Sequence, residues 1–289
     1  MKQKLLLIGL LGICLQGCQA PGKKGTSLFD KANLVAWCIV PFDALERSPE
    51  QRARMLQELG IPALAYDYRD AHLPSFPQEI RTLKDHHIAL RAVWLWADPR
   101  QEDVLGAAGR RVFEVLDSTG TRTEIWVGMP ENAFEGLPDS ECLELALSSL
   151  REIMEEARKI GCSLALYNHG GWYGEPRNLV RMAGELGKKQ VRIVYNFHHA
   201  HEQVERFPES LDLMLPYLST INLNGMRAGG PKIIPLGEGD RELEMMQCIL
   251  DSGYAGSIGI LGHTEGEDIR KVLERNLQGL ERLKDQLRQ

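Results

Sequence analysis

The sequence is poor in basic residues, and its cysteines follow no pattern that indicates a metal site. Its 34 lysines and arginines are outnumbered by 40 aspartates and glutamates, which gives a formal net charge of −6. Because no basic stripe stands out, we expect no nucleic-acid partner. The 6 cysteines lack the paired spacing of cysteine-based metal sites, which argues against a site of that kind.

Disulfide bonds are not indicated either. Cys142 and Cys162 lie near opposite ends of one expected helix, which places them roughly 30 Å apart by helical rise. That separation is too large for a disulfide. Together with Cys38 and Cys248, these residues are expected to be buried free thiols.

The apolar run near the beginning of the chain, Leu5 to Leu15, is too short to span a bilayer. It follows a basic start and leads into Leu15-Gln-Gly-Cys18, so residues 1–17 are predicted to be a secretory signal. The ending resembles the lipobox of bacterial lipoproteins, which implies that Cys18 is lipidated; the alternative is an ordinary cleaved signal with a chance cysteine. We expect a protein anchored by lipid in the bacterial cell envelope, facing the periplasm or the exterior.

Two further segments follow the predicted signal. Residues 18–32 are expected to form a flexible tether, because Pro21 to Ser27 is a short run of Gly, Lys, Thr and Ser after a proline. Residues 33–287 are long enough for one large α/β domain with an ample core.

In this domain, apolar runs of strand length alternate with amphipathic runs of helix length. The first expected helix is capped by Ser48, with Gln51 closing a capping box, and it ends at Gly60. The expected strands are residues 34–40, 63–67, 89–96, 123–129, 163–168, 191–197, 220–223 and 257–261. The later expected helices are residues 75–86, 101–117, 140–160, 175–186, 201–217 (with a break expected at Pro208), 241–251 and 265–287.

Eight successive strand–helix units predict a parallel sheet with right-handed crossovers that closes into a single (β/α)8 TIM barrel. The alternative is an open, doubly wound sheet. Such a sheet usually has a glycine-rich phosphate loop after an early strand. Neither Val40-Pro-Phe nor Asp67-Tyr-Arg provides one, so the closed barrel is favoured.

Polar residues close four of the apolar runs in the second half of the chain. The runs are Leu164 to His169, Ile193 to His199, Ile221 to Asn224 and Ile258 to His263. In a parallel barrel the carboxyl ends of the strands converge on one face, where active sites are built. The sequence therefore predicts a polar pocket on that face.

Several of these segments resemble the xylose isomerase-like superfamily of sugar isomerases and epimerases. The resemblance covers roughly residues 33–283 and is strongest in four segments. They are Tyr167-Asn-His-Gly-Gly171, Tyr195-Asn-Phe-His-His-Ala-His201, Pro235-Leu-Gly-Glu-Gly-Asp240 and Gly256-Ser-Ile-Gly-Ile-Leu-Gly262. The resemblance implies a (β/α)8 barrel and a small carbohydrate as ligand.

The chain departs from the family at the metal ligands. Family members usually hold a divalent metal with Glu, Asp, His and a second Glu. Here the corresponding positions carry Tyr167, Asn196, Asn222, and either Leu261 or His263. A softer site made by His169, His199 and His263 would suit zinc, manganese or cobalt.

The acid/base candidates are His169, His199 and Lys232. Histidine titrates near neutrality, which suits proton transfer, and a loop lysine after the seventh strand could act as a base or hold a sugar oxygen. The alternatives are neutral histidines bonded to neighbouring strands and a solvated lysine. Because consecutive strand residues point in opposite directions, either His198 or His199 is expected to face away from the pocket.

The expected substrate-binding residues are tryptophans that could stack on a sugar ring and polar residues that could hold its oxygens. They are Trp37, Asp67, Arg69, Trp96, Asn168, Trp172, Asn196, Asn222 and Asn224. For Asp67 and Arg69 a salt bridge on the barrel rim is the alternative. Trp94 and Trp126 are expected in the core.

These observations lead to two functional hypotheses. The first is an exported, lipid-anchored enzyme, an isomerase, epimerase or lyase, that moves a proton next to the carbonyl of a sugar or keto-sugar. The second is a non-catalytic carbohydrate-binding barrel that has lost the family's metal site. An exported setting favours free sugars, oligomeric sugars or oxidised glycosides over phosphorylated ones.

Overall fold

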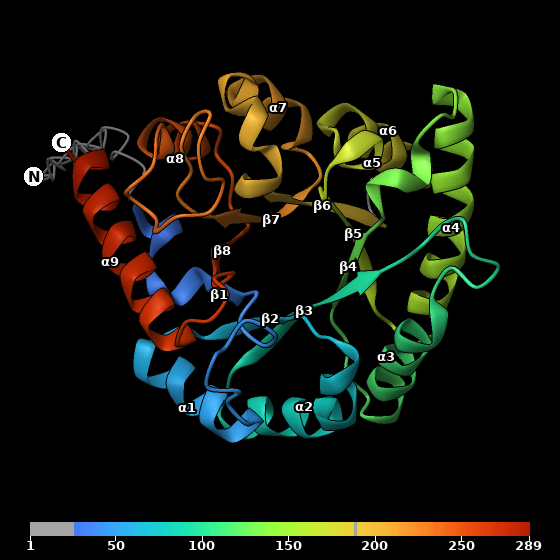
Figure 1. Ribbon diagram of the computed structural model, residues 1–289, viewed down its shortest axis with the longest axis horizontal. Coiled ribbons are helices and arrows are strands. Elements are labelled where there is room, and N and C mark those ends of the chain that lie inside the picture. Colours follow the sequence, from blue (N-terminus) through green and yellow to red (C-terminus); the bar gives the residue numbers. More distant parts are fainter. Residues whose placement is uncertain (1–25, 188–189) are drawn as a thin grey trace, which may run out of the picture.

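Eight parallel strands close into a barrel in the order of the sequence, with β8 paired to β1 (Figure 1). The structure is a computed structural model that describes residues 26–187 and 190–289. The strands are β1 (Leu34–Trp37), β2 (Ala63–Tyr66), β3 (Ala89–Trp96), β4 (Glu124–Gly128), β5 (Ser163–Tyr167), β6 (Val191–Asn196), β7 (Leu218–Leu223) and β8 (Ser257–Leu261). The predicted signal and Cys18 lie outside the described residues.

Helices surround this barrel as an outer ring (Figure 1). They are α1 (Pro49–Leu59), α2 (Phe76–Asp85), α3 (Gly106–Ser118), α4 (Asp139–Lys159), α5 (Gly171–Gly174), α6 (Pro176–Leu186), α7 (Phe207–Met214), α8 (Glu242–Asp251) and α9 (Ile269–Leu287). The predicted (β/α)8 barrel is thereby confirmed. Within the described ranges, none of these helices is both long and apolar enough to cross a membrane.

Local signals set the ends of α1 as the sequence indicates. The Ser48 side chain accepts a hydrogen bond from the Gln51 backbone, and the Gln51 side chain accepts one from the Ser48 backbone. At the other end, Gly60 takes a left-handed conformation with φ 73°, which a side chain would disfavour.

Three helices begin later than predicted. Helix α3 starts at Gly106 rather than residue 101, and α9 starts at Ile269 rather than residue 265, after Asp268 as its N-cap. The segment expected as one helix over residues 201–217 is a 3-10 segment, η5 (Phe197–Arg206), followed by α7. Pro208 lies in the first turn of α7, where a missing N–H does no harm.

Residues that we assigned to the tether are packed against β8 and α9 of the barrel. Two short 3-10 turns, η1 (Thr26–Phe29) and η2 (Lys31–Asn33), precede β1. Phe29 is fully buried, and the Asn33 side chain donates hydrogen bonds to Leu28 O and Gly256 O at 2.8 and 3.0 Å. The folded part therefore begins before residue 33.

The barrel interior is filled by alternating small and large side chains. Alanines on β2, β3 and β5 leave room for three aromatic side chains, Trp37, Trp126 and Tyr167. The Trp37 and Trp126 rings lie 5.0 Å apart, and Trp37 Nε1 donates a hydrogen bond to the Tyr167 hydroxyl at 3.2 Å. Trp126 is fully buried, as predicted.

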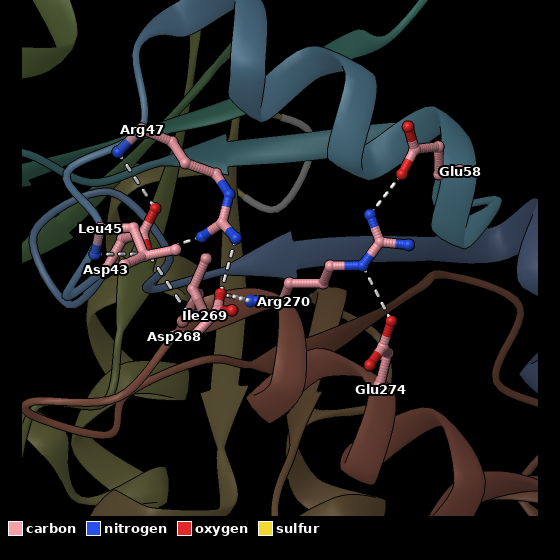
Figure 2. Close-up of polar contacts among 8 residues, drawn as sticks. All are labelled: Asp43, Leu45, Arg47, Glu58, Asp268, Ile269, Arg270 and Glu274. Atoms are coloured by element: carbon pink, nitrogen blue, oxygen red, sulfur yellow. Dashed lines mark hydrogen bonds and ion pairs between the residues drawn. The ribbon is translucent and has the colours of Figure 1, made fainter.

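Charged residues join the first and last strand–helix units (Figure 2). Arg47 contacts Asp43 at 2.7 Å and Asp268 at 2.6 Å. Asp268 also accepts the backbone N–H of Arg270 at 3.0 Å, which caps α9. Further out, the Arg270 guanidinium pairs with Glu58 of α1 and Glu274 of α9. These contacts hold the loop after β1 against the helix that follows β8.

The four cysteines of the barrel are free, as predicted. Cys38 and Cys142 are buried, whereas Cys162 and Cys248 are only half-buried, which corrects the expectation that all four are buried.

Candidate active site

A cavity of about 250 Å³ lies at the carboxyl ends of the strands, above the Trp37 and Tyr167 rings. We call it the central cavity. It is lined by Trp37, Cys38, Phe42, Asp67, Arg69, Trp94, Glu131, Tyr167, His169, His198, His199, Lys232, Ile233 and His263. The predicted polar pocket is therefore present where the barrel topology requires it.

Four histidines from three strand ends meet in this cavity. The ring centres of His169 and His199 are 4.5 Å apart, those of His198 and His199 are 3.9 Å apart, and those of His198 and His263 are 6.3 Å apart. The prediction that His198 or His199 faces away is wrong. Strand β6 ends at Asn196, so both residues belong to the 3-10 segment η5, where strand alternation no longer applies.

Burial keeps these imidazoles uncharged. Desolvation, followed by the positive charge of Lys232, lowers the pKa of His169 to about 4. Desolvation also lowers the pKa of His198 to about 3 and is the main cause of the lowered pKa values of His199 and His263. Near neutral pH each ring therefore has a lone pair that can accept a proton or a hydrogen bond.

Lys232 is the cation whose charge acts on all four histidines. It lies on a loop after β7 that folds back on itself, with Gly225 and Ile234 exchanging backbone hydrogen bonds at 3.1 and 2.9 Å. The buried Asn224 side chain donates to Lys232 O at 2.9 Å. Asn224 thus positions the lysine, whereas we expected it to hold substrate oxygens.

Asp67 provides a buried carboxyl group on the wall of the central cavity. It is 2 % exposed, and Oδ1 accepts a hydrogen bond from Val40 N at 3.4 Å. Oδ2 has no hydrogen-bond partner in the described part of the chain. Desolvation raises the pKa of Asp67 to about 7, against the lowering effect of Arg69. The predicted alternative, a salt bridge between these two residues, is not formed.

The other three asparagines belong to the barrel wall and not to the cavity surface. The Asn168 side chain accepts hydrogen bonds from the backbone and side-chain amides of Asn196, both at 2.7 Å. Asn222 Nδ2 donates to Asn196 Oδ1 at 2.6 Å. All three residues are at most 2 % exposed. Their amides tie β5, β6 and β7 together, which corrects the substrate-binding role that we predicted for them.

The tryptophans are distributed over the floor and two flanks of the site. Trp37 is part of the floor. Trp94, which we expected in the core, instead lines the central cavity and the flank where Trp96 lies. The Trp96 ring is 4.7 Å from that of His169. Trp172 lies on the opposite flank, with Nε1 donating to Asp139 at 2.8 Å.

Several lining residues were missed by the sequence reasoning. They are Cys38, Phe42, Glu131, Tyr167 as a floor residue, and Ile233. A sequence signal existed for Glu131 in the pair Gly170-Gly171. A Cβ added to Gly170 would lie 2.4 Å from Glu131 Oε1, so glycine is needed there for the carboxylate to reach the cavity. Cys38, Phe42 and Ile233 come from loops, whose positions the strand pattern does not predict, and Tyr167 is the last residue of β5.

The barrel and its polar mouth agree with the comparison to known families. A profile described as xylose isomerase-like TIM barrel matches residues 30–285. The chain belongs to this family. No curated protein sequence matches the chain significantly.

Solved structures of the family share the fold at low sequence identity. One is the apo form of 3-keto-D-glucoside 4-epimerase, YcjR, from E. coli (TM-score 0.67, 14 % identity, 86 % of this chain and 99 % of that one). Another is the IOLI protein with a bound zinc atom (TM-score 0.66, 12 % identity, 88 % and 99 %). A third is a Mycobacterium smegmatis protein in complex with magnesium (TM-score 0.56, 16 % identity, 88 % and 97 %).

The residues of this chain do not fit a divalent metal of that kind. Within residues 26–187 and 190–289, no three His, Cys, Asp or Glu side chains are grouped closely enough to hold one. His263 lines the same cavity as His169 and His199, with its ring 3.8 Å from that of Phe42, but in the described ranges the three do not form a metal-binding group. The predicted three-histidine set is therefore not assembled.

Three positions expected to carry metal ligands in the family, two carboxylates and one histidine, also fail to supply ligands here. Asn196 and Asn222 bond to each other, and burial raises the pKa of Tyr167 well above its usual value, so its phenol stays protonated. The Lys232 ammonium on the cavity wall would in addition repel a second cation.

Proposed function

We propose that this protein is a sugar isomerase or epimerase that moves a proton at the carbon next to a carbonyl group. The proposal rests on the side-chain groups that line the central cavity. A carboxyl group with a pKa of about 7, neutral imidazoles and an ammonium group surround one small space. These are the groups that enolisation requires: a base, an acid and a charge that stabilises the oxyanion.

The positions of these groups suggest separate roles. Lys232 is an exposed residue that borders the cavity from the solvent side, and its ammonium would stabilise the negative charge that develops on the carbonyl oxygen. Asp67 would exchange a proton near neutral pH, where its pKa is best matched to the medium. His169 and His199, uncharged at that pH, would accept or return the proton on the other side.

The two sides of the cavity matter for the stereochemical outcome. Asp67 follows β2, whereas His169 and His199 follow β5 and β6, which lie across the barrel from β2. A sugar held between them could lose a proton from one face and regain it on the other. This arrangement supports epimerisation more than a one-sided transfer. The solved relatives that act on sugars are consistent with it.

Solvent deuterium exchange tests the proposal directly. A panel of ketoses and 3-keto-glycosides in D₂O should show enzyme-dependent loss of one C–H proton signal by NMR. Lys232→Met and His169→Gln should each slow this exchange by about 10²-fold or more. Lys271→Met, the same change as at Lys232 but at an exposed position of α9 outside the cavity lining, provides a matched control that should fold and exchange at a similar rate.

Other outcomes select other functions. Sugar binding without exchange would support the alternative, a non-catalytic carbohydrate-binding barrel. Exchange accompanied by release of the group at the β-carbon would indicate a lyase, which begins with the same proton removal. Exchange that survives both substitutions would show that the assigned residues do not catalyse it.

We also propose that the protein is exported and lipid-anchored, because of the Leu15-Gln-Gly-Cys18 pattern. Replacing Cys18→Ser should move the protein from the membrane fraction to the soluble fraction after cell disruption. Retention in the membrane fraction would contradict lipidation at this residue.

A further inference from the structure

A second cavity of about 860 Å³ opens beside the central cavity, on the side of β3. We call it the tryptophan cavity. Its lining residues are Tyr68, Arg69, Asp70, Ala71, Trp94, Trp96, Asp98, Gln101, Asp103, Val104, Leu105, Gly106, Ala107, Ala108 and His169. Arg69, Trp94 and His169 border the central cavity as well, so the two spaces adjoin at the proposed catalytic residues.

The walls of the tryptophan cavity are flat and apolar. The Trp94 and Trp96 rings lie 5.5 Å apart at an interplanar angle of 34°. They stand over Gly128, where an added Cβ would come within 3.3 Å of both rings. Val104 and Leu105, both buried, also line the cavity, and an added Cβ on Gly106 would meet nothing within 4 Å. The space between the walls is therefore open.

Two of the three acidic residues that line this cavity, Asp98 and Asp103, are engaged with their own loop, whereas Asp70 is an exposed residue at the rim. Asp98 accepts hydrogen bonds from the Arg100 backbone at 3.0 Å and from Gln101 Nε2 at 3.2 Å. Asp103 accepts from Arg110 Nε at 2.6 Å and from the Leu105 backbone at 3.2 Å. These carboxylates are poorly placed to bind sugar hydroxyls, which leaves the apolar walls as the main contact surface.

The opposite flank of the central cavity has a different chemistry. A polar cavity of about 490 Å³ there includes Glu131, Glu175, Glu202 and Gln203 together with Trp172. A second sugar unit would find hydroxyl partners on that side. In the tryptophan cavity the polar side chains Arg69, Asp70 and Gln101 line the space together with two indole rings, and those rings suit contact with an aromatic ring. The two flanks are thus distinguishable by the ligand each prefers.

We propose that the substrate is a glycoside with an aromatic aglycone, which lies against Trp96 in the tryptophan cavity. The reacting sugar occupies the central cavity, whose volume of about 250 Å³ is below that of sites for drug-sized ligands. The 4.7 Å contact between the Trp96 and His169 rings places the aglycone next to a proposed proton-transfer residue. This inference rests on the proposed function and names the substrate class for the same site.

Calorimetric binding of matched glycosides tests the inference. The probes are methyl and 4-nitrophenyl glycosides of the same hexose and anomer, over a panel of hexoses. For at least one hexose, the 4-nitrophenyl glycoside should bind about tenfold more tightly than the methyl glycoside. Trp96→Ala should remove this preference. Trp172→Ala, the same change on the opposite flank, should leave the ratio of the two affinities as it is.

A second variant covers the case in which Trp96→Ala folds poorly. Ala107 is an exposed residue of the cavity wall, so Ala107→Phe should fold and fill the space from the other side. It should also abolish the preference for the nitrophenyl glycoside.

The remaining outcomes separate this inference from the proposed function. Methyl glycosides that bind as tightly as their nitrophenyl counterparts would overturn the aglycone site and leave the proposed function standing. A disaccharide that gains as much affinity through Trp96 would overturn the aromatic assignment. If no glycoside binds, this inference is wrong, and deuterium exchange on free ketoses decides the proposed function.

Discussion

Two buried aspartates near the carboxyl ends of the strands have opposite surroundings. Asp43, 6 % exposed, accepts hydrogen bonds from the backbones of Leu45, Arg47 and Ile269 and from the Arg47 guanidinium (Figure 2). Asp67, 2 % exposed, accepts one backbone hydrogen bond, and its Oδ2 has no partner in the described ranges.

Burial alone does not indicate that a carboxylate has a catalytic role. A buried carboxylate that is fully hydrogen-bonded stabilises the fold, whereas one that lacks partners costs free energy unless a ligand or a proton satisfies it. Asp43 helps to hold the first strand–helix unit against the last one, through Arg47 and Ile269. Asp67 faces a cavity with a raised pKa, which is the usual state of an acid/base group. The same substitution, aspartate to asparagine, should therefore have different effects at the two positions.

The largest effect is expected on activity at Asp67. Asp67→Asn should reduce the deuterium-exchange rate on the best substrate of the panel by about 10²–10⁴-fold, because asparagine cannot transfer a proton. The free energy of unfolding at pH 7.5 should not fall, since no ion pair is lost. Full activity in the Asp67→Asn variant would mean that another residue transfers the proton. As a control, Asp43→Asn should keep the exchange rate close to that of the unchanged protein.

The second effect is a loss of stability at Asp43. Asp43→Asn should lower the free energy of unfolding by about 2 kcal/mol, because the Arg47 guanidinium and three backbone amides lose a charged acceptor. Urea denaturation followed by circular dichroism measures this change, with Asp67→Asn as the matched comparison. Equal stability losses in the two variants would refute the distinction between the two aspartates.

The third effect is a pH dependence of the free energy of unfolding that comes from Asp67. The folded-state pKa of Asp67 is about 7, above the usual value for an unfolded chain, so the folded protein binds the extra proton between about pH 4 and 7. This group therefore loses stabilisation as pH rises, by at most about 1.4 kcal/mol per pH unit. The lowered pKa values of the histidines act in the opposite direction.

Subtracting the free energy of unfolding of the unchanged protein from that of the Asp67→Asn variant isolates the contribution of Asp67. The stability of Asp67→Asn relative to the unchanged chain should rise from pH 4 to pH 7 and then level off. Denaturation curves at several pH values give this difference. A difference that does not change with pH would mean that Asp67 titrates normally.

The smallest effect is expected at the Arg270 ion pairs, which join α1 and α9 near the protein surface. Arg270 pairs with Glu58 and Glu274, but all three side chains are largely exposed, so water and salt weaken these contacts (Figure 2). Arg270→Gln should lower the melting temperature slightly at low salt and not at all in 1 M salt. A loss as large as that of Asp43→Asn, persisting at high salt, would show that the outer pairs matter as much as the buried one.

Part of the site was predictable because strand ends in a parallel barrel converge. The histidines at residues 169, 199 and 263 were placed at the mouth by their position after apolar runs, and the structure brings them there. Asn168 follows β5, and Asn196 and Asn222 lie at the carboxyl ends of β6 and β7. Their role differs because they face one another across the strands, and the sequence does not reveal which neighbours pair.

The loops explain most other differences. The pattern of residues 101–105 is compatible with a helix, but Asp98 and Asp103 bond to nearby backbone amides and hold this segment in turns. That change opens the wall of the tryptophan cavity. Similarly, the alternation of a strand stops at Asn196, so His198 and His199 both reach the pocket.

By itself, the sequence determined the repeating strand–helix units, the ends of α1 and the gathering of histidines at one face. Hydrophobic periodicity and capping residues act over a few neighbouring positions, so they can be read along the chain. Tertiary structure decided which polar groups are satisfied and which are left for a ligand. That outcome depends on contacts between distant strands and loops, as the different environments of Asp43 and Asp67 illustrate.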